Sequence, residues 1–105
     1  MSPPLFRLEV VTPESPVLSE DVQSLVAPGE DGYLGVLAHH APLLTALKAG
    51  DLKITRAAGE EVHYSIIGGF MEVTGTAAVV LADGIELKDA DSAEAAASPS
   101  QGREV

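Results

Sequence analysis

Apolar and polar residues alternate in short runs along most of the chain, and this alternation indicates strands. Phe6, Leu8 and Val10 alternate with charged residues, and the same period of two returns at 52–54 and 62–66. Such a period places the apolar side chains on one face of a half-buried strand. Many short strands separated by turn residues favour an antiparallel β-sandwich or flattened barrel. We therefore predict an all-β fold.

Glycine and proline mark the positions where these runs should turn. "TPESP" at 12–16 contains two prolines that exclude a helix, and "AAGEE" at 57–61 reads as a turn around its glycine. "GEDG" at 29–32 has the composition of a tight turn that needs a positive φ. A hairpin is expected around Gly75.

Three further glycine positions lie inside apolar runs. Gly35 interrupts "YLGVL" and predicts a bulge or a close backbone approach, whereas Gly68 and Gly69 in "IIGGF" predict a sharp bend between sheets. "PLLTALKAGDL" at 42–52 has apolar residues at helical spacing. Its pieces are short, however, and Gly50 breaks it, so strands are expected there as well.

The composition changes near the end of the chain. We place a β-sandwich domain at 1–87 and a short helical or disordered tail at 88–105. Asp91 or Ser92 could cap a helix of about seven residues, well below the roughly 12 to 15 needed for marginal stability alone. Disorder is expected at 98–105.

Composition and charge limit the possible partners. A chain of 105 residues, 46% of them apolar and 4% aromatic, suits one domain with an aliphatic core. The net charge of −10 disfavours nucleic acid and anionic membranes, because both require clustered bases. There is no cysteine, no run long enough to cross a membrane and no signal-peptide pattern, so we expect a soluble intracellular protein without lipid insertion.

Adjacent His39 and His40 pose the main question about chemistry. On a strand their side chains would point to opposite faces, so they could share a metal ion only in a loop. His63 and Glu72 would join them only if the fold brought them close. The favoured interpretation is that one histidine is a hydrogen-bonded loop anchor and the other is exposed. A small β-barrel metalloenzyme using His39, His40 or His63 remains the alternative.

Other kinds of site have little support in the sequence. No serine lies in a G-x-S-x-G turn, and the acidic pairs at 30–31 and 60–61 fall on turns where water would solvate them. A stand-alone carbohydrate-binding sandwich would need aromatic platforms, and the chain has no tryptophan. We predict no catalytic residue, no metal and no cofactor.

Several motifs in order carry a resemblance to a known family. They are "PGEDGYLGVL" at 28–37, "HAPLLTALKAG" at 40–50, "GGFMEV" at 68–73 and "VLAD" at 80–83. Together they resemble the N-terminal domain of the epsilon subunit of F-type ATP synthases, over about residues 5–91. That family folds as an antiparallel β-sandwich followed by a two-helix hairpin.

The resemblance implies a non-catalytic rotor subunit of the central stalk. It would bind the foot of the gamma subunit and rest on the ring of c subunits, so that ion-driven rotation reaches the catalytic head. It would lie at the cytoplasmic face of a bacterial inner membrane. Exposed aliphatic residues at 34–44 would supply the docking energy. The turn at 30–33 would approach the c ring, and the loop at 40–42 would lie near gamma and the ring. The residues implied at the two interfaces are Glu30, Asp31, Tyr33, Leu34, His40, Ala41, Pro42 and Leu43.

The tail departs from the family pattern. The family's first helix begins with an Asp-x-x-Arg-Ala motif that contributes to an ATP site in some bacterial members, and the matching stretch here is "DSAEA". Asp91 and Ala95 match, but Glu94 stands in place of the arginine, and a carboxylate repels phosphates that a guanidinium would bind. With no second helix to extend, we expect neither ATP binding nor inhibition of hydrolysis by a helical arm.

Overall fold

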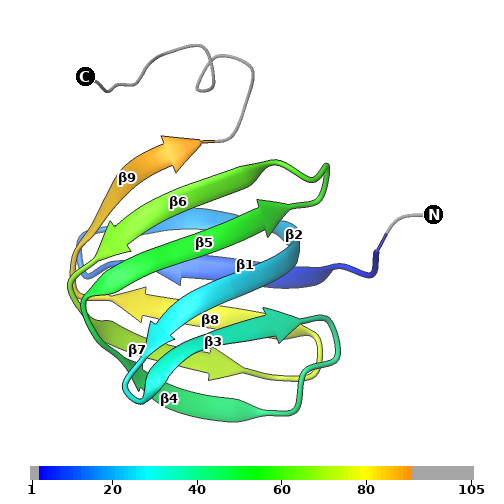
Figure 1. Ribbon diagram of the computed structural model, residues 1–105, viewed down its shortest axis with the longest axis horizontal. Coiled ribbons are helices and arrows are strands. Elements are labelled where there is room, and N and C mark those ends of the chain that lie inside the picture. Colours follow the sequence, from blue (N-terminus) through cyan, green and yellow to red (C-terminus); the bar gives the residue numbers. More distant parts are fainter. Residues whose placement is uncertain (1–2, 91–105) are drawn as a thin grey trace.

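Nine strands make up the regular structure of the computed structural model, which describes residues 3–90 (Figure 1). Their bounds are β1 (Phe6–Val11), β2 (Pro16–Gly29), β3 (Gly32–Leu37), β4 (Leu43–Leu47), β5 (Gly50–Arg56), β6 (Glu61–Ile66), β7 (Gly69–Val73), β8 (Ala77–Ala82) and β9 (Ile85–Ala90). No helix that could span a membrane occurs among the described residues.

The strands form two layers joined by the long strand β2. One layer has the order β1-β8-β7-β4, and the other contains β5, β6 and β9 (Figure 1). The first half of β2 pairs with β1, and its second half pairs with β3 and β5. The β2–β5 pairing shifts register between Val22 and Ser24. The β-sandwich expected from the alternation is confirmed. Its strand pairs are antiparallel except for β1 with β8, which is parallel.

The core consists of aliphatic side chains that both layers point inward. Leu8 and Met71 come from one layer and Leu52 and Ile54 from the other, and all four are fully buried. Phe6 is the only aromatic residue among the buried ones in the described part of the chain. Each such side chain contributes about 1.5–3 kcal/mol through burial, so the two layers hold together without a disulfide.

The predicted turns are confirmed, whereas the prediction made for Gly35 is not. Gly32 closes the turn between β2 and β3 with φ 135°, Gly59 has φ 98°, and the turn containing Gly75 joins β7 to β8. Gly35 was expected to mark a bulge or a close approach, and this is wrong. The β2–β3 register runs through it without a shift, and a Cβ there would meet open space.

The paired glycines carry the chain from one layer to the other. β6 ends before Gly68 and β7 begins at Gly69, with φ of 143° and 149° at the two positions. A Cβ on Gly69 would collide with the carbonyl oxygen of Leu81 and lie 3.0 Å from the Cα of Ala82. The predicted bend between sheets is confirmed, and glycine is required there for both conformation and space.

The last strand reaches further than the expected sandwich domain. β9 pairs with β6 and runs to Ala90, so the boundary expected at residue 87 falls inside this strand. The rest of the expected tail, 91–105, lies outside the described residues.

Substituting Gly69 tests the layer crossing. We expect Gly69→Ala to lower the free energy of unfolding by about 3 kcal/mol, because it adds φ strain and a backbone collision. The matched control, Gly35→Ala, should change it by less than about 0.5 kcal/mol, since its Cβ meets no atom. Urea titration measures both, and equal effects would contradict the assigned role of Gly69.

Candidate functional site

The two segments expected to dock lie at opposite ends of β3. Glu30 and Asp31 form the exposed tip of the β2–β3 turn, and residues 38–42 connect β3 to β4. A strand of six residues separates them by about 20 Å. The structure therefore does not bring the two segments together at one point.

Both segments nevertheless border the same strand, β4. The 38–42 loop leads into its first residue, Leu43, and the backbone N–H of Glu30 donates to the carbonyl of Ala46 near its other end (3.1 Å). Just past β4, the N–H of Lys48 donates to the carbonyl of Pro28 (2.9 Å). A partner lying along β4 would reach from one candidate segment to the other.

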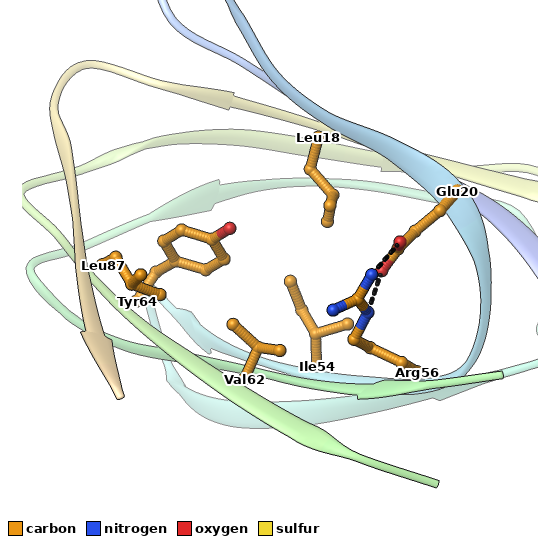
Figure 2. Close-up of a pocket in the computed structure, with 7 residues that line it drawn as sticks. All are labelled: Leu18, Glu20, Ile54, Arg56, Val62, Tyr64 and Leu87. Atoms are coloured by element: carbon orange, nitrogen blue, oxygen red, sulfur yellow. Dashed lines mark hydrogen bonds and ion pairs between the residues drawn. The ribbon is translucent and has the colours of Figure 1, made fainter. Parts of the chain in front are cut away.

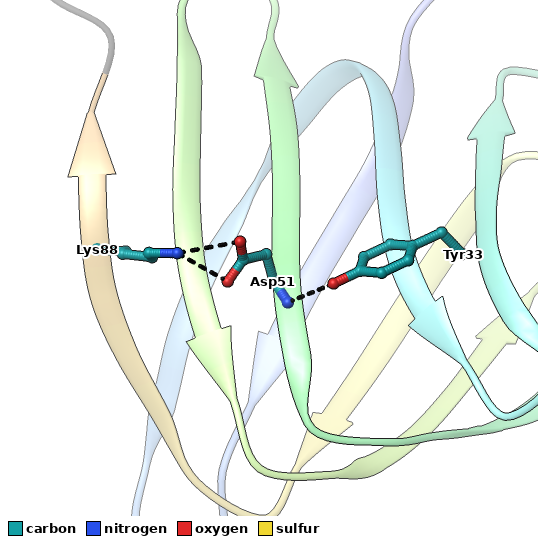
Figure 3. Close-up of polar contacts among 3 residues, drawn as sticks. All are labelled: Tyr33, Asp51 and Lys88. Atoms are coloured by element: carbon teal, nitrogen blue, oxygen red, sulfur yellow. Dashed lines mark hydrogen bonds and ion pairs between the residues drawn. The ribbon is translucent and has the colours of Figure 1, made fainter.

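Tyr33 is held in place by contacts within the protein. Its hydroxyl accepts a hydrogen bond from the backbone N–H of Asp51 (3.0 Å), and the Asp51 carboxylate accepts from Nζ of Lys88 on β9 at 3.0 and 3.1 Å (Figure 3). A Cβ on Gly50 would lie 2.8 Å from the tyrosine hydroxyl. Tyr33 thus fixes the β2–β3 hairpin to the neighbouring strand, although 58% of the residue remains exposed.

The aliphatic residues at 34–44 that were expected to contact a partner differ in how much of their surface is exposed. Leu34 and Leu43 are half-buried and pack against the core, so little of their surface is free for a partner. Leu37 and Leu44 instead face water, with 64% and 72% of their surface exposed. Of the stretch 34–44, these two present the most apolar surface.

The two histidines shape their loop in different ways. His39 is exposed and is the only non-glycine residue in the described part of the chain with a positive φ, 66°. His40 is half-buried; its backbone N–H donates to the carbonyl of Leu37 (3.2 Å), and its Nδ1 lies 2.6 Å from the carbonyl oxygen of Ala41. That last contact requires a proton on Nδ1. The predicted combination of one anchored and one exposed histidine is confirmed, and Ala41 and Pro42 complete the exposed turn.

The histidines do not gather with other metal ligands. His63 lies on β6, where its Nε2 is 3.5 Å from a carboxylate oxygen of Glu61. Within residues 3–90, no three histidine, aspartate or glutamate side chains are close enough to hold a metal ion.

An inward-facing ion pair lies at the open edge between the layers. A cavity of about 170 Å³ there is lined by Leu18, Glu20, Ile54, Arg56, Val62, Tyr64 and Leu87 (Figure 2). Nε and a terminal nitrogen of Arg56 lie 2.8 and 2.9 Å from the two carboxylate oxygens of Glu20. The hydrogen bond to Glu20, with the charge of that carboxylate, raises the pKa of Arg56, and burial raises the pKa of Tyr64. The two charges neutralise each other, so the cavity offers no net charge to a ligand, although Oε2 of Glu20 is buried without a hydrogen bond of good geometry.

The sequence interpretation missed this pair and a second group of exposed residues. Arg56 continues the inward alternation of Leu52 and Ile54, which was the available signal. Phe70 and Leu81 are 55% and 53% exposed, side by side on β7 and β8. Their exposure follows from the sheet register, which local alternation does not reveal.

Known proteins similar to this chain agree on one family. The family model described as "ATP synthase, Delta/Epsilon chain, beta-sandwich domain" matches residues 5–88. Proteins named ATP synthase epsilon chain are similar, including one from Desulforamulus reducens (47% identity over 90% of this chain) and one from Mesorhizobium japonicum (39% over 87%). A third, from Pelotomaculum thermopropionicum, is 49% identical over 82%.

The chain spans only part of these relatives, covering 71%, 68% and 63% of their lengths in the same order. Two solved structures share the fold. A chain of the Euglena gracilis mitochondrial ATP synthase (OSCP/F1/c-ring) matches with a TM-score of 0.77 at 24% identity, over 83% of this chain and 56% of that one. A chain of the Tetrahymena thermophila mitochondrial ATP synthase (central stalk/c-ring) matches at 0.67 and 16%, over 82% and 69%.

The hydroxyl of Tyr33 provides a test of the hairpin's attachment. We expect Tyr33→Phe to lower the free energy of unfolding by about 1 kcal/mol, because the Asp51 N–H loses its acceptor. Hydrogen exchange at the Asp51 amide should accelerate as well. Tyr64→Phe is the control, since none of the side-chain hydrogen bonds among residues 3–90 involves the Tyr64 hydroxyl. Unchanged Asp51 exchange in Tyr33→Phe would contradict the assignment.

Proposed function

The chain belongs to the ATP synthase delta/epsilon chain family, and we propose that it acts as the rotor subunit that links the gamma subunit to the c ring. In this role it is an accessory subunit without catalytic residues of its own. It transmits ion-driven rotation toward the catalytic head, and so takes part in ion transport and ATP synthesis only as part of the whole complex.

The observation that carries this proposal is the extent of the family match. It covers residues 5–88, which is nearly the whole described sandwich of residues 3–90. The resemblance carried by the sequence motifs is therefore confirmed at the level of the family. The two similar solved structures are an OSCP/F1/c-ring assembly and a central stalk/c-ring assembly of mitochondrial ATP synthases.

Contacts with the two partners are assigned to the segments that border β4. The exposed turn with Glu30, Asp31 and Tyr33 is assigned to the c ring, and the loop with His40, Ala41 and Pro42 to gamma and the ring. Leu34 and Leu43 support these segments from the core side. Backbone hydrogen bonds and the Tyr33–Asp51 contact hold the turn in a fixed shape, which favours rigid transmission of torque.

The proposed location is the cytoplasmic face of a bacterial inner membrane, where the subunit is peripheral. The net charge of −10 favours contact with protein over contact with anionic lipid or nucleic acid. No lipid insertion is needed for this role.

Co-elution with gamma tests the proposed function. We expect the chain and the gamma subunit from the same source to elute as a stable one-to-one complex on gel filtration. Added to the catalytic head, the chain should leave ATP hydrolysis uninhibited. A folded chain that forms no complex with gamma would contradict the proposal.

The tail motif leads to a separate expectation about ATP. Asp91, Glu94 and Ala95 lie outside the described residues, so the proposal rests on the sequence, where Glu94 stands in place of the family's arginine. We expect no micromolar ATP binding by calorimetry, because the carboxylate repels the phosphates. Glu94→Arg is the matched variant. Micromolar binding by the unaltered chain would contradict this expectation.

A further inference from the structure

The cavity at the open edge between the layers has no part in the proposed function. Its volume is about 170 Å³, and a cavity of about 150 Å³ is enough to bind benzene, so there is room for one ring-sized molecule. Four of its lining residues are aliphatic: Leu18 on β2, Ile54 on β5, Val62 on β6 and Leu87 on β9. Small-molecule sites have this composition, a mostly apolar wall with a few polar groups.

The polar groups that this wall offers to a ligand are mainly hydrogen-bond donors. Figure 2 shows the Tyr64 hydroxyl pointing into the cavity, and one terminal nitrogen of Arg56 turned away from Glu20 toward the aliphatic residues. No side-chain hydrogen bond among residues 3–90 uses this nitrogen or the Tyr64 hydroxyl. Two donors from different strands are therefore available to one acceptor atom.

Glu20 provides charge to the cavity but no accessible acceptor. Nitrogens of Arg56 lie 2.9 and 2.8 Å from its two carboxylate oxygens, and Oε2 is buried. A donor on a ligand would have to displace Arg56 to reach that oxygen. The carboxylate also offsets the charge of Arg56, so an anion gains little there, and a cation would face the guanidinium. A neutral ligand with an acceptor avoids all three costs.

The cavity is open to solution on the side where β9 ends the sheet. 42% of the Arg56 side chain and 58% of Leu87 are exposed. A molecule of ring size can therefore enter from this edge without opening the core.

We propose that this cavity binds a small neutral molecule that has an apolar ring and one acceptor oxygen, as a cyclic ketone has. The oxygen accepts from Arg56 and Tyr64, and the ring lies among the four aliphatic side chains. The inference goes beyond the proposed function and does not depend on it. The lining residues belong to β2, β5, β6 and β9, and none lies in the segments assigned to gamma or the c ring.

Three molecules with the same ring test this chemistry on the full chain. Cyclohexanone carries an acceptor oxygen, cyclohexylammonium carries only donors, and cyclohexanecarboxylate carries a negative charge. We expect cyclohexanone to shift the methyl NMR signals of Leu18, Val62 and Leu87 with a dissociation constant on the order of 1 mM, which is within the limit for so few atoms. The two ions should bind at least about tenfold more weakly.

Substitutions locate the bound molecule. Tyr64→Phe keeps the ring and removes one donor, so we expect cyclohexanone to bind about fivefold more weakly. Leu87→Trp should fill the cavity from its exposed edge and abolish the shifts of Leu18 and Val62. The matched control is Leu44→Trp, at an exposed position on β4, and it should leave the affinity unchanged.

The other outcomes would overturn the inference. Equal affinity for the three molecules would remove the assigned ligand class, and binding that survives Leu87→Trp would place the molecule elsewhere. Absence of methyl shifts with cyclohexanone would overturn the site itself. Nuclear Overhauser contacts from residues 91–105 to the methyl groups of Leu18 or Val62 would show that the chain's own segment fills the cavity, and would overturn it as well. All of these measurements use the free chain, so their failure is distinct from a failure to bind gamma.

Discussion

The close approach of Gly69 to the backbone of Leu81 is the contact on which the arrangement of the layers depends. The chain leaves one layer after β6 and enters the other at β7, and it does so at two glycines with positive φ. No side chain fits at Gly69. The approach sets the β7–β8 register, in which Gly69 faces Ala82 and Phe70 faces Leu81. Inward burial of Met71 and outward exposure of Phe70 follow from that register.

The two outer faces of this sandwich differ in their ion pairs and in their exposed apolar surface. In the layer with β5, β6 and β9, Lys53 is paired with Glu61 and Lys88 with Asp51, and Asp51 ties this layer to the β2–β3 hairpin. The other layer leaves apolar groups and carboxylates without partners in the described part of the chain. The proposed role as a stalk subunit needs a rigid body with a binding face, and strand pairing around the core supplies the rigidity. No titrating or nucleophilic group has to take part.

Local patterns in the sequence predicted the strands, the turns and the bend because these depend on near neighbours. Phe6, Leu8 and Val10 alternate with charged residues because one face of β1 is buried. The bend at Gly68 and Gly69 was predictable because both residues adopt a positive φ that glycine favours. The failures involve distant partners or ambiguous faces. In "GFMEV" either alternate set could have faced inward. The Glu20–Arg56 pair joins residues 36 positions apart in the chain, and Tyr33 finds Asp51 18 positions away. A Cβ at Gly35 would meet no atom within 4 Å, so the presence of glycine at this position did not indicate a bulge or a close contact.

Thiol labelling in the assembled synthase tests the central claim of the proposed function, that the loop entering β4 lies against a partner subunit. The chain has no cysteine, so each introduced cysteine gives a single label. Leu44→Cys places a thiol on β4, next to Leu43, and Glu86→Cys places one on β9 in the opposite layer. The account predicts that maleimide labels both positions in the free chain, whereas in the assembled synthase it labels only position 86. Equal labelling of position 44 in the free and assembled states would contradict it.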